Sequence, residues 1–292
     1  MAPLALAMLL PTSAVQAEKY QLAMKRERKV GDKYIAQVEA ESKQTFSQTL
    51  NGNKKENKKE LVGSMTATVE VLGVYDDGRA KRVAVKVEKF DAKSNGKPVK
   101  LDTTQRIIAT SSEGDVTYKY ENGTQLSPEE ADAFDFFDQF LPGQFLPAEL
   151  RDTPSDKKIF KIEQPREVGT SWEADHKLMA KSLSGDKMTV DTKDIDSEFE
   201  FIEVAQFNGK KVAVIDITVV MNKLSITGRD QNEVVLSKGS AEISMAGLIP
   251  LDPTCSDGTL NVAMKVNHVG GLQGEISVDV EMDMKAEFTQ IK

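Results

Sequence analysis

Hydrophobic and polar side chains alternate along much of the chain with a period of two residues. The longest such run covers residues 276–288, where Ile, Val, Met, Ala and Phe alternate with Ser, Asp, Glu and Lys. Similar runs occur at 82–88, 241–245 and 260–266. Because successive side chains of a strand point to opposite faces, this pattern predicts long strands with one apolar face. Such strands are typical of antiparallel sheets that are covered on one side.

Asn-Gly and Asp-Gly pairs mark the predicted turns. Both pairs tolerate the positive φ angles of tight hairpins, so a pair flanked by strand patterns indicates a hairpin. The pairs at 77–78 and 208–209 have strand patterns on both sides, which predicts a β-meander. The complete set lies at 51–52, 77–78, 95–96, 122–123, 208–209 and 257–258.

One amphipathic helix is predicted over residues 128–141. Ser127 suits the N-cap, Pro128 the first helical position and Glu130 the third, where it completes a capping box. A Pro-Gly pair follows residue 141 and ends the helix. The apolar face of this helix, which lies opposite an acidic face, consists of Ala133, Phe134, Phe136, Phe137, Phe140 and Leu141.

The Phe-rich helix has two interpretations. As a lid over an apolar groove, it would present a candidate ligand face made of Phe134, Phe136, Phe137, Phe140 and Leu141. Alternatively, the helix packs on the sheet and each Phe contributes ~1.5–3 kcal/mol of burial to the core. A helix on a membrane surface is disfavoured, since its acidic face would be repelled by anionic head groups.

The two halves of the chain resemble each other. The sequence Val-Gly-Asp-Lys-Tyr at 30–34 and the sequence Val-Gly-Thr-Ser-Trp at 168–172 each open a strand, and a Val-rich strand follows a Gly turn in both halves. We therefore expect a mainly β fold of two similar antiparallel curved-sheet units, half-barrel-like, with the helix near their junction. The first unit would cover residues 18–155 and the second residues 156–292.

Residues 1–17 have the pattern of a signal peptide. They carry no charge, and residues 2–10 form an apolar run that is too short to span a bilayer. Val15 and Ala17 occupy the −3 and −1 positions of a cleavage site before Glu18. A buried N-terminal helix is the alternative. We expect export to the periplasm or the extracellular space, and a mature chain without a transmembrane segment.

Composition and motifs argue against several functional classes. A net charge of −8 disfavours a nucleic-acid binder, and a single Cys excludes a disulfide scaffold. Cys255 is expected to be either a small buried residue or a thiol that faces a partner. Of the two His residues, His176 follows Asp175 in a predicted strand, where neighbours point to opposite faces. His268 lies thirteen residues after Cys255, and we expect Cys255 in a loop and His268 at a strand end. We predict no catalytic residue, metal site or cofactor, and therefore no enzyme.

A run of Lys, Glu and Asn at residues 53–60 joins two predicted strands. It could contact an anionic polymer or lipopolysaccharide. The alternating Glu residues and the position between strands favour a solvated hairpin tip.

The Val-Gly-x-x-aromatic openings, the hairpin strands and the closing stretch with Gly258, Gly270, Gly274 and Asp283 resemble a family of exported bacterial proteins of unknown function. That family is built from a duplicated antiparallel β unit. The chain is more distantly similar to periplasmic lipoprotein carriers and mycobacterial lipid-binding half-barrels. The second resemblance implies that acyl chains would lie between a concave sheet and helices.

Two functions are compatible with these observations. The first is an exported, non-enzymatic binding protein that holds an apolar or amphiphilic, lipid-like ligand between a curved sheet and the Phe-rich helix. The alternative is a structural or partner-binding module of the cell envelope that has no small-molecule ligand.

Overall fold

The computed structural model describes residues 18–22, 28–50, 53–76, 78, 80–112, 115–138, 156–183, 188–226, 238–252, 255, 257–270 and 275–291. The predicted signal peptide at 1–17 lies outside these residues, as do Phe140 and Leu141 of the candidate ligand face.

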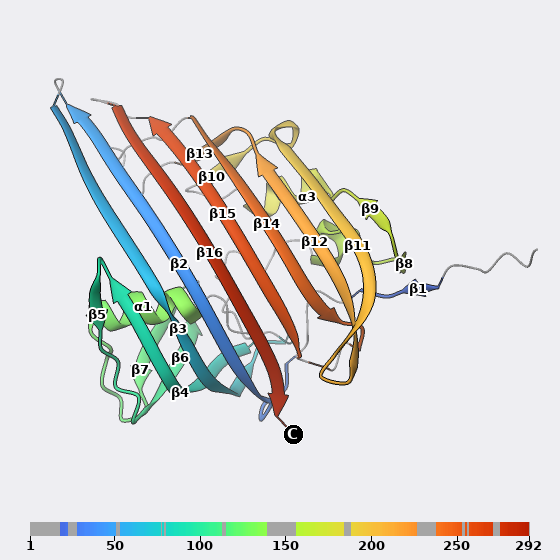
Figure 1. The fold of residues 1–292 in the computed structure, drawn as a ribbon, viewed down its shortest axis with the longest axis horizontal. Coiled ribbons are helices and arrows are strands. Elements are labelled where there is room, and N and C mark those ends of the chain that lie inside the picture. The colour runs from blue at the N-terminus through green and yellow to red at the C-terminus, as the bar shows by residue number, and fades with distance from the viewer. Residues whose placement is uncertain are drawn as a thin grey trace, which may run out of the picture.

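The fold is mainly β, as the alternation predicts. Twelve strands form one antiparallel sheet in the order β7-β6-β4-β3-β2-β16-β15-β14-β12-β11-β9, with β5 paired to β4 (Figure 1). Two small sheets, β1-β8 and β10-β13, lie apart from it. The strands are β1 (Lys19–Tyr20), β2 (Lys33–Leu50), β3 (Asn53–Val74), β4 (Ala80–Ser94), β5 (Lys97–Val99), β6 (Arg106–Ser112), β7 (Asp115–Tyr120), β8 (Arg166–Glu167), β9 (Thr170–Trp172), β10 (Met188–Val190), β11 (Ile195–Phe207), β12 (Lys210–Met221), β13 (Leu224–Ile226), β14 (Lys238–Pro250), β15 (Gly258–Gly270) and β16 (Glu275–Ile291).

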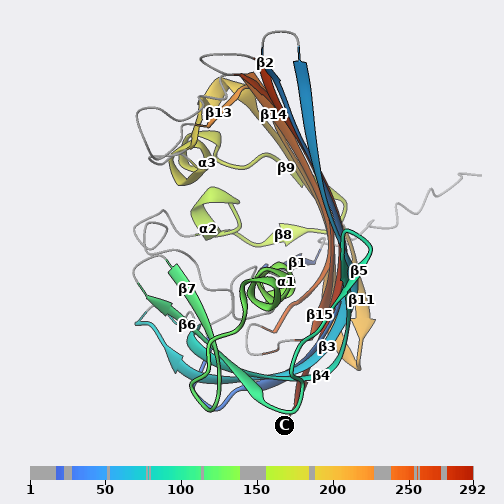
Figure 2. The ribbon, with the colours of Figure 1, turned by 90° about the vertical axis from the view of Figure 1, so that its left-hand side faces the viewer.

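The large sheet is curved, and the helices lie on its concave side (Figure 2). They are α1 (Pro128–Asp138), α2 (Asp156–Ile159) and α3 (His176–Leu183), with a 3-10 turn η2 at Thr192–Asp194. Helix α1 is the predicted helix, and its capping box is present: Ser127 N–H donates to Glu130 Oε2 over 2.8 Å, and Glu130 N–H donates to Ser127 Oγ over 3.3 Å. The sequence did not predict α2 or α3.

Strands from both halves of the chain belong to one continuous sheet. β2 pairs with β16 along its length, so that Ala40 lies opposite Met284 and Lys33 opposite Ile291. The first long strand of the chain therefore lies beside the last one, at the centre of the sheet (Figure 1). The proposed internal duplication, with a boundary near residue 156, stays a prediction.

The core consists of two clusters inside the curve of the sheet. The first lies where α1 packs on β2, β3, β4 and β6, and it includes Tyr34, Met65, Val85, Phe134 and Phe137. The second lies where α2 and α3 pack on β11 and β12, and it includes Leu22, Ile162, Phe199, Phe201 and Ile215. Between the two clusters run the central strands β14, β15 and β16.

The long hairpin between β11 and β12 confirms the predicted turn at 208–209. Asn208 and Gly209 both have positive φ, 49° and 75°, as a tight hairpin turn requires. Asn95 and Gly96 have the same conformation, with φ of 51° and 75°, between β4 and β5.

Candidate functional site

The pairing register aligns inward-facing side chains from neighbouring strands into rows that cross the sheet. One row passes from β12 to β3 through successive paired residues: Val219, Ile243, Met264, Met282, Ser42 and Leu61. The next row passes through Ile217, Met245, Val262, Met284, Ala40 and Gly63. The concave face is thus an apolar surface several strands wide.

The middle of this surface is only partly buried. We call the partly buried side chains on the three central strands the inner band. Its members are Ile243 and Met245 on β14, Val262, Met264 and Val266 on β15, and Val278, Val280 and Met282 on β16.

The inner band lies between the two core clusters. Val262 and Met282 pack against the first cluster, and Ile243, Met245 and Val266 pack against the second. Concave, mostly apolar surface that stays partly open is the usual setting for an apolar ligand. The sequence-based prediction placed a ligand between a curved sheet and the helix, but it named candidate residues on the helix alone. The alternation at 241–245, 260–266 and 276–288 marks the apolar face of each strand, but it does not show which strands are neighbours.

The side chains of α1 that were proposed as a ligand face contact other protein side chains. Phe134 and Phe137 are 0% exposed and Phe136 is 7% exposed. The Phe134 ring meets Tyr118 edge-on at 5.2 Å between centroids, and the Phe137 ring meets Phe90 in the same way at 5.8 Å. In this conformation, a ligand would reach these rings only if α1 separated from the sheet.

Polar contacts also hold α1 in place. Lys59 on β3 forms an ion pair with Asp132 over 3.2 Å. Tyr120 Oη donates to Glu130 Oε1 over 2.8 Å and accepts a hydrogen bond from Asp102 N–H over 3.1 Å. Burial raises the pKa of Tyr120 to about 12, so the phenol is neutral and can donate to the Glu130 carboxylate at neutral pH.

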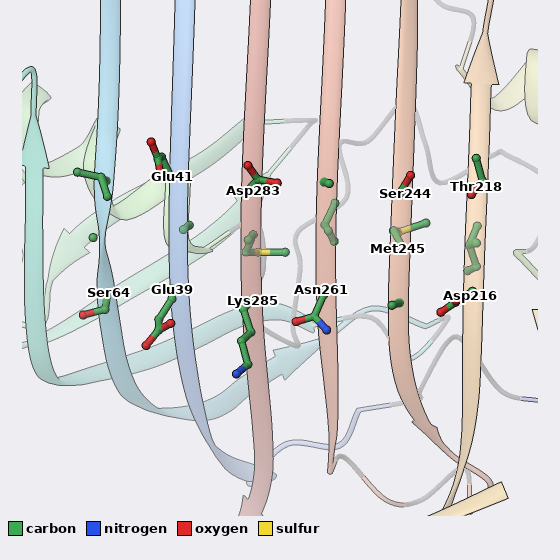
Figure 3. Close-up of a pocket in the computed structure, with 18 of the residues that line it drawn as sticks. Glu39, Glu41, Ser64, Asp216, Thr218, Ser244, Met245, Asn261, Asp283 and Lys285 are labelled. Carbon is green, nitrogen blue, oxygen red and sulfur yellow. The ribbon is translucent and has the colours of Figure 1, made fainter. Parts of the chain in front are cut away.

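The outer face of the sheet carries an open groove of about 800 Å³ that is lined by charged, polar and apolar residues (Figure 3). Asp91 and Lys93 of β4 line it, whereas Ala92 between them is buried in the core, which assigns the groove to the outer face. Charged residues on β2 and β16 face each other there: Glu39 lies opposite Lys285, and Glu41 opposite Asp283. The charges are mixed and the groove is open, as expected for the solvated face of a sheet that is covered on one side.

His176 lies at the start of α3, which corrects its predicted position in a strand. Asp175 caps this helix by accepting a hydrogen bond from Leu178 N–H over 2.9 Å, so the local turn is helical and not extended. His176 Nε2 lies 2.9 Å from Ser197 Oγ, which also accepts a hydrogen bond from Ala174 N–H. These contacts attach the beginning of α3 to β11.

Cys255 and His268 are not brought together. Cys255 is buried before β15 begins, whereas His268 lies near the far end of that strand, roughly 33 Å away at ~3.3 Å per residue. The neighbours of Cys255 are Asp257, whose N–H donates to the Cys255 sulfur over 3.4 Å, and Lys210. Hydrogen bonding to Cys255 and then to Asp257 raises the pKa of Lys210. Cys255 is therefore part of a buried structural contact.

No helix in the part of the chain that the structure describes is long and apolar enough to cross a membrane. No protein-family model matches the chain, and no curated protein matches it. Among solved structures, the chain is similar to a structure titled "Lipid-protein interactions in lipovitellin", with a TM-score of 0.34 and 9% sequence identity. The match covers 91% of this chain and 26% of the lipovitellin chain, and at that TM-score the likeness assigns no function.

Proposed function

We propose that this protein is an exported, non-enzymatic binding protein that holds an apolar or amphiphilic, lipid-like ligand against its inner band. The observation that carries the proposal is the partial burial of Met264, Val278 and Val280, which face the concave side of the sheet and belong to neither core cluster. A sheet whose apolar face is fully covered would bury these side chains as completely as it buries Tyr34 or Val69.

The free energy available on this surface is sufficient for reversible binding. If a ligand covered about 200 Å² of the band and lost a similar area of its own, burial would contribute about 10 kcal/mol at ~25 cal/mol per Å². The loss of translational and rotational freedom costs at least about 4 kcal/mol. With this smallest cost, the difference corresponds to a dissociation constant of tens of micromolar, which a larger cost would weaken and polar contacts would tighten.

Native mass spectrometry of the gently purified protein, followed by organic extraction, tests this function directly. A stoichiometric adduct of lipid-like mass is the expected result. A clean mass that is unchanged after incubation with phospholipid vesicles would contradict the proposal. The partner-binding module of the cell envelope would then be the better interpretation.

A pair of variants locates the ligand. Val280→Asp places a carboxylate in the inner band, whereas Val269→Asp makes the same change on the outer face of β15, where Val269 is 42% exposed. With Nile red as the apolar probe, we expect Val280→Asp to weaken binding at least about tenfold, since a charge would have to be desolvated against the ligand. Val269→Asp should leave it unchanged.

Thermal melts show whether each variant is folded. If Val280→Asp does not fold, the nearly isosteric Val280→Thr takes its place. Equal binding by both folded variants would show that the ligand lies elsewhere.

A further inference from the structure

The β2–β3 hairpin extends the sheet beyond its neighbour β4. The β3–β4 pairing ends where Leu61 lies opposite Ser94, and Glu60 is still hydrogen-bonded to Asn95, so residues 53–59 of β3 pair with β2 alone. In Figure 1 the ends of β2 and β3 reach one end of the long sheet, beside β16. The charged run at 53–60, which was expected to form a solvated hairpin tip, is therefore part of a strand.

Strand alternation separates the lysines of this run onto two faces. Lys54 and Lys58 point outward, and both form ion pairs of 3.1 Å with Glu56. Lys55 and Lys59 point inward, on the same face as buried Leu61. Lys59 is paired with Asp132, and none of the described carboxylates lies within ion-pair distance of Lys55. On the outward side, Lys54 and Lys58 are balanced by Glu56 and Glu60 of the same strand face. On the inward side, Lys55 and Lys59 with Asp132 leave one positive charge.

An exposed aromatic ring lies between the inward lysines and the inner band. Phe46 of β2 is 42% exposed, and it lies opposite Asn57, between Lys55 and Lys59 along β3. On its other side, Phe46 lies opposite Val278 of the inner band. Because adjacent strands are ~4.8 Å apart, the inward lysines lie about 10 Å across the sheet from Val278 and Val280.

We propose that the ligand is an anionic amphiphile, with its head group at Lys55 and Lys59 and its apolar chain along the inner band. This inference rests on the proposed function and adds the charge and orientation of the ligand. The chain carries 38 Lys and Arg residues against 46 Asp and Glu residues, which gives a net charge of −8. A local excess of positive charge at Lys55 and Lys59 would attract an anion to this end of the sheet.

The dimensions agree with one acyl chain. From Val278 to the row of Val262 and Met284, the band extends over six residues of β16, or about 20 Å. One leaflet of the hydrocarbon core of a bilayer is about 15 Å thick, which is the length of one ordered acyl chain. A chain of this length would lie on the band with its head group beside Phe46 and the two lysines.

Lysines on an unpaired strand edge also prevent edge-to-edge aggregation, and that role alone would require no ligand. If the lysines only protect the edge, substitution of Lys54 and of Lys55 should have equivalent effects, because both belong to the same exposed segment. If the lysines form a head-group site, the two substitutions should have different effects on ligand binding, because Lys54 and Lys55 point to opposite faces. The comparison of these two neighbours therefore separates the two roles.

The test uses the full chain and isothermal titration calorimetry at low salt, with three probes below their aggregation concentrations. Laurate and dodecyltrimethylammonium share a twelve-carbon chain and differ in charge, and acetate carries the carboxylate without the chain. We expect laurate to bind at least about fivefold more tightly than dodecyltrimethylammonium. Acetate should not compete with laurate at the same concentration.

Two matched variants then change the net charge equally. Lys55→Glu should weaken laurate binding about tenfold and strengthen binding of the cationic probe, whereas Lys54→Glu should change either affinity by less than about twofold. Both side chains are exposed, so the melting temperature should be unchanged. Should Lys55→Glu fail to fold, Lys55→Gln provides the same comparison with about half the effect on the binding free energy.

Three results would overturn the inference. Equal affinity for the two charged probes, or equal effects of the two lysine variants, would remove the head-group site while leaving apolar binding intact. Competition by acetate would indicate a site for free anions. If neither amphiphile binds, the proposed function itself fails, which is a different outcome from the loss of charge preference.

Discussion

The position of Phe137 makes a sharp prediction about whether α1 is part of the core. Its side chain is 0% exposed and meets two aromatic rings edge-on, Phe90 at 5.8 Å and Phe136 at 5.3 Å between centroids. Phe137→Ala would remove this burial, leave a cavity under the helix and delete both ring contacts.

The expected loss of stability follows from these contacts. Truncation of a buried Phe to Ala costs about 3–5 kcal/mol in total, and the two edge-on aromatic pairs, worth about 0.5–1.5 kcal/mol each beyond their area, place Phe137 in the upper part of that range. The free energy of unfolding should therefore fall by about 4–5 kcal/mol. At about 2–4 °C per kcal/mol for a chain of this size, the melting temperature should fall by roughly 8–20 °C.

Urea unfolding followed by circular dichroism measures this change, and Phe46→Ala provides the matched control. Phe46 is 42% exposed, so its truncation should cost less than about 1 kcal/mol. The same variant should weaken laurate binding, because Phe46 lies between the inward lysines and the inner band. The two Phe variants are expected to separate stability from ligand affinity.

A loss below about 1 kcal/mol in Phe137→Ala would refute this reasoning. It would mean that α1 does not pack on the sheet in solution, and that the helix could open as a lid over the apolar face. The candidate ligand face on α1 would then become accessible without unfolding.

Three further outcomes are expected. Gly63→Ala should unfold the protein or lower its stability by at least about 3 kcal/mol in urea unfolding, because the new Cβ would lie 2.2 Å from the backbone oxygen of Asp91. Gly239→Ala should also destabilise, as its Cβ would lie 2.2 Å from the buried His268 ring, and thermal melts would show the change. Folding raises the pKa of Tyr120 from 10.0 to about 12. The neutral phenol thus contributes stability that is complete below pH 10 and is lost as the pH rises from about 10 to about 12. Thermal melts across this pH range should therefore show a smaller loss of stability in Tyr120→Phe than in the unchanged protein.

Local signals in the sequence were sufficient to predict several of the long strands and the start of α1. The alternation at 276–288 corresponds to β16, and Ser127 with Glu130 forms the capping box. The geometry of both features depends on residues that are close in sequence. The short helix α3 was missed although Asp175 is a suitable cap, because eight residues give too little periodicity to distinguish a helix from a strand.

The inner band could not be predicted, because it depends on which strands are neighbours. Met282 lies beside Ser42 and Met264, and only the pairing register brings these three residues into one row. The sequence shows that each strand has an apolar face, but not that the last long strand pairs with the first. The Phe residues of α1 were the more visible apolar cluster, and the structure buries those that it describes in the core.

The pairing of β2 with β16 also determines when the inner band can exist. Residues 275–291 are synthesised long after residues 33–50, with which they pair. At a synthesis rate of ~5–20 residues per second, the delay is roughly 10–50 s. Until then, β2 has an unpaired edge on that side, where other strands could attach. Contacts between such distant parts of a chain form slowly, so the docking of β16 should be a late step in folding. Because β16 supplies Val278, Val280 and Met282, a nascent chain has no complete ligand surface until this strand is in place.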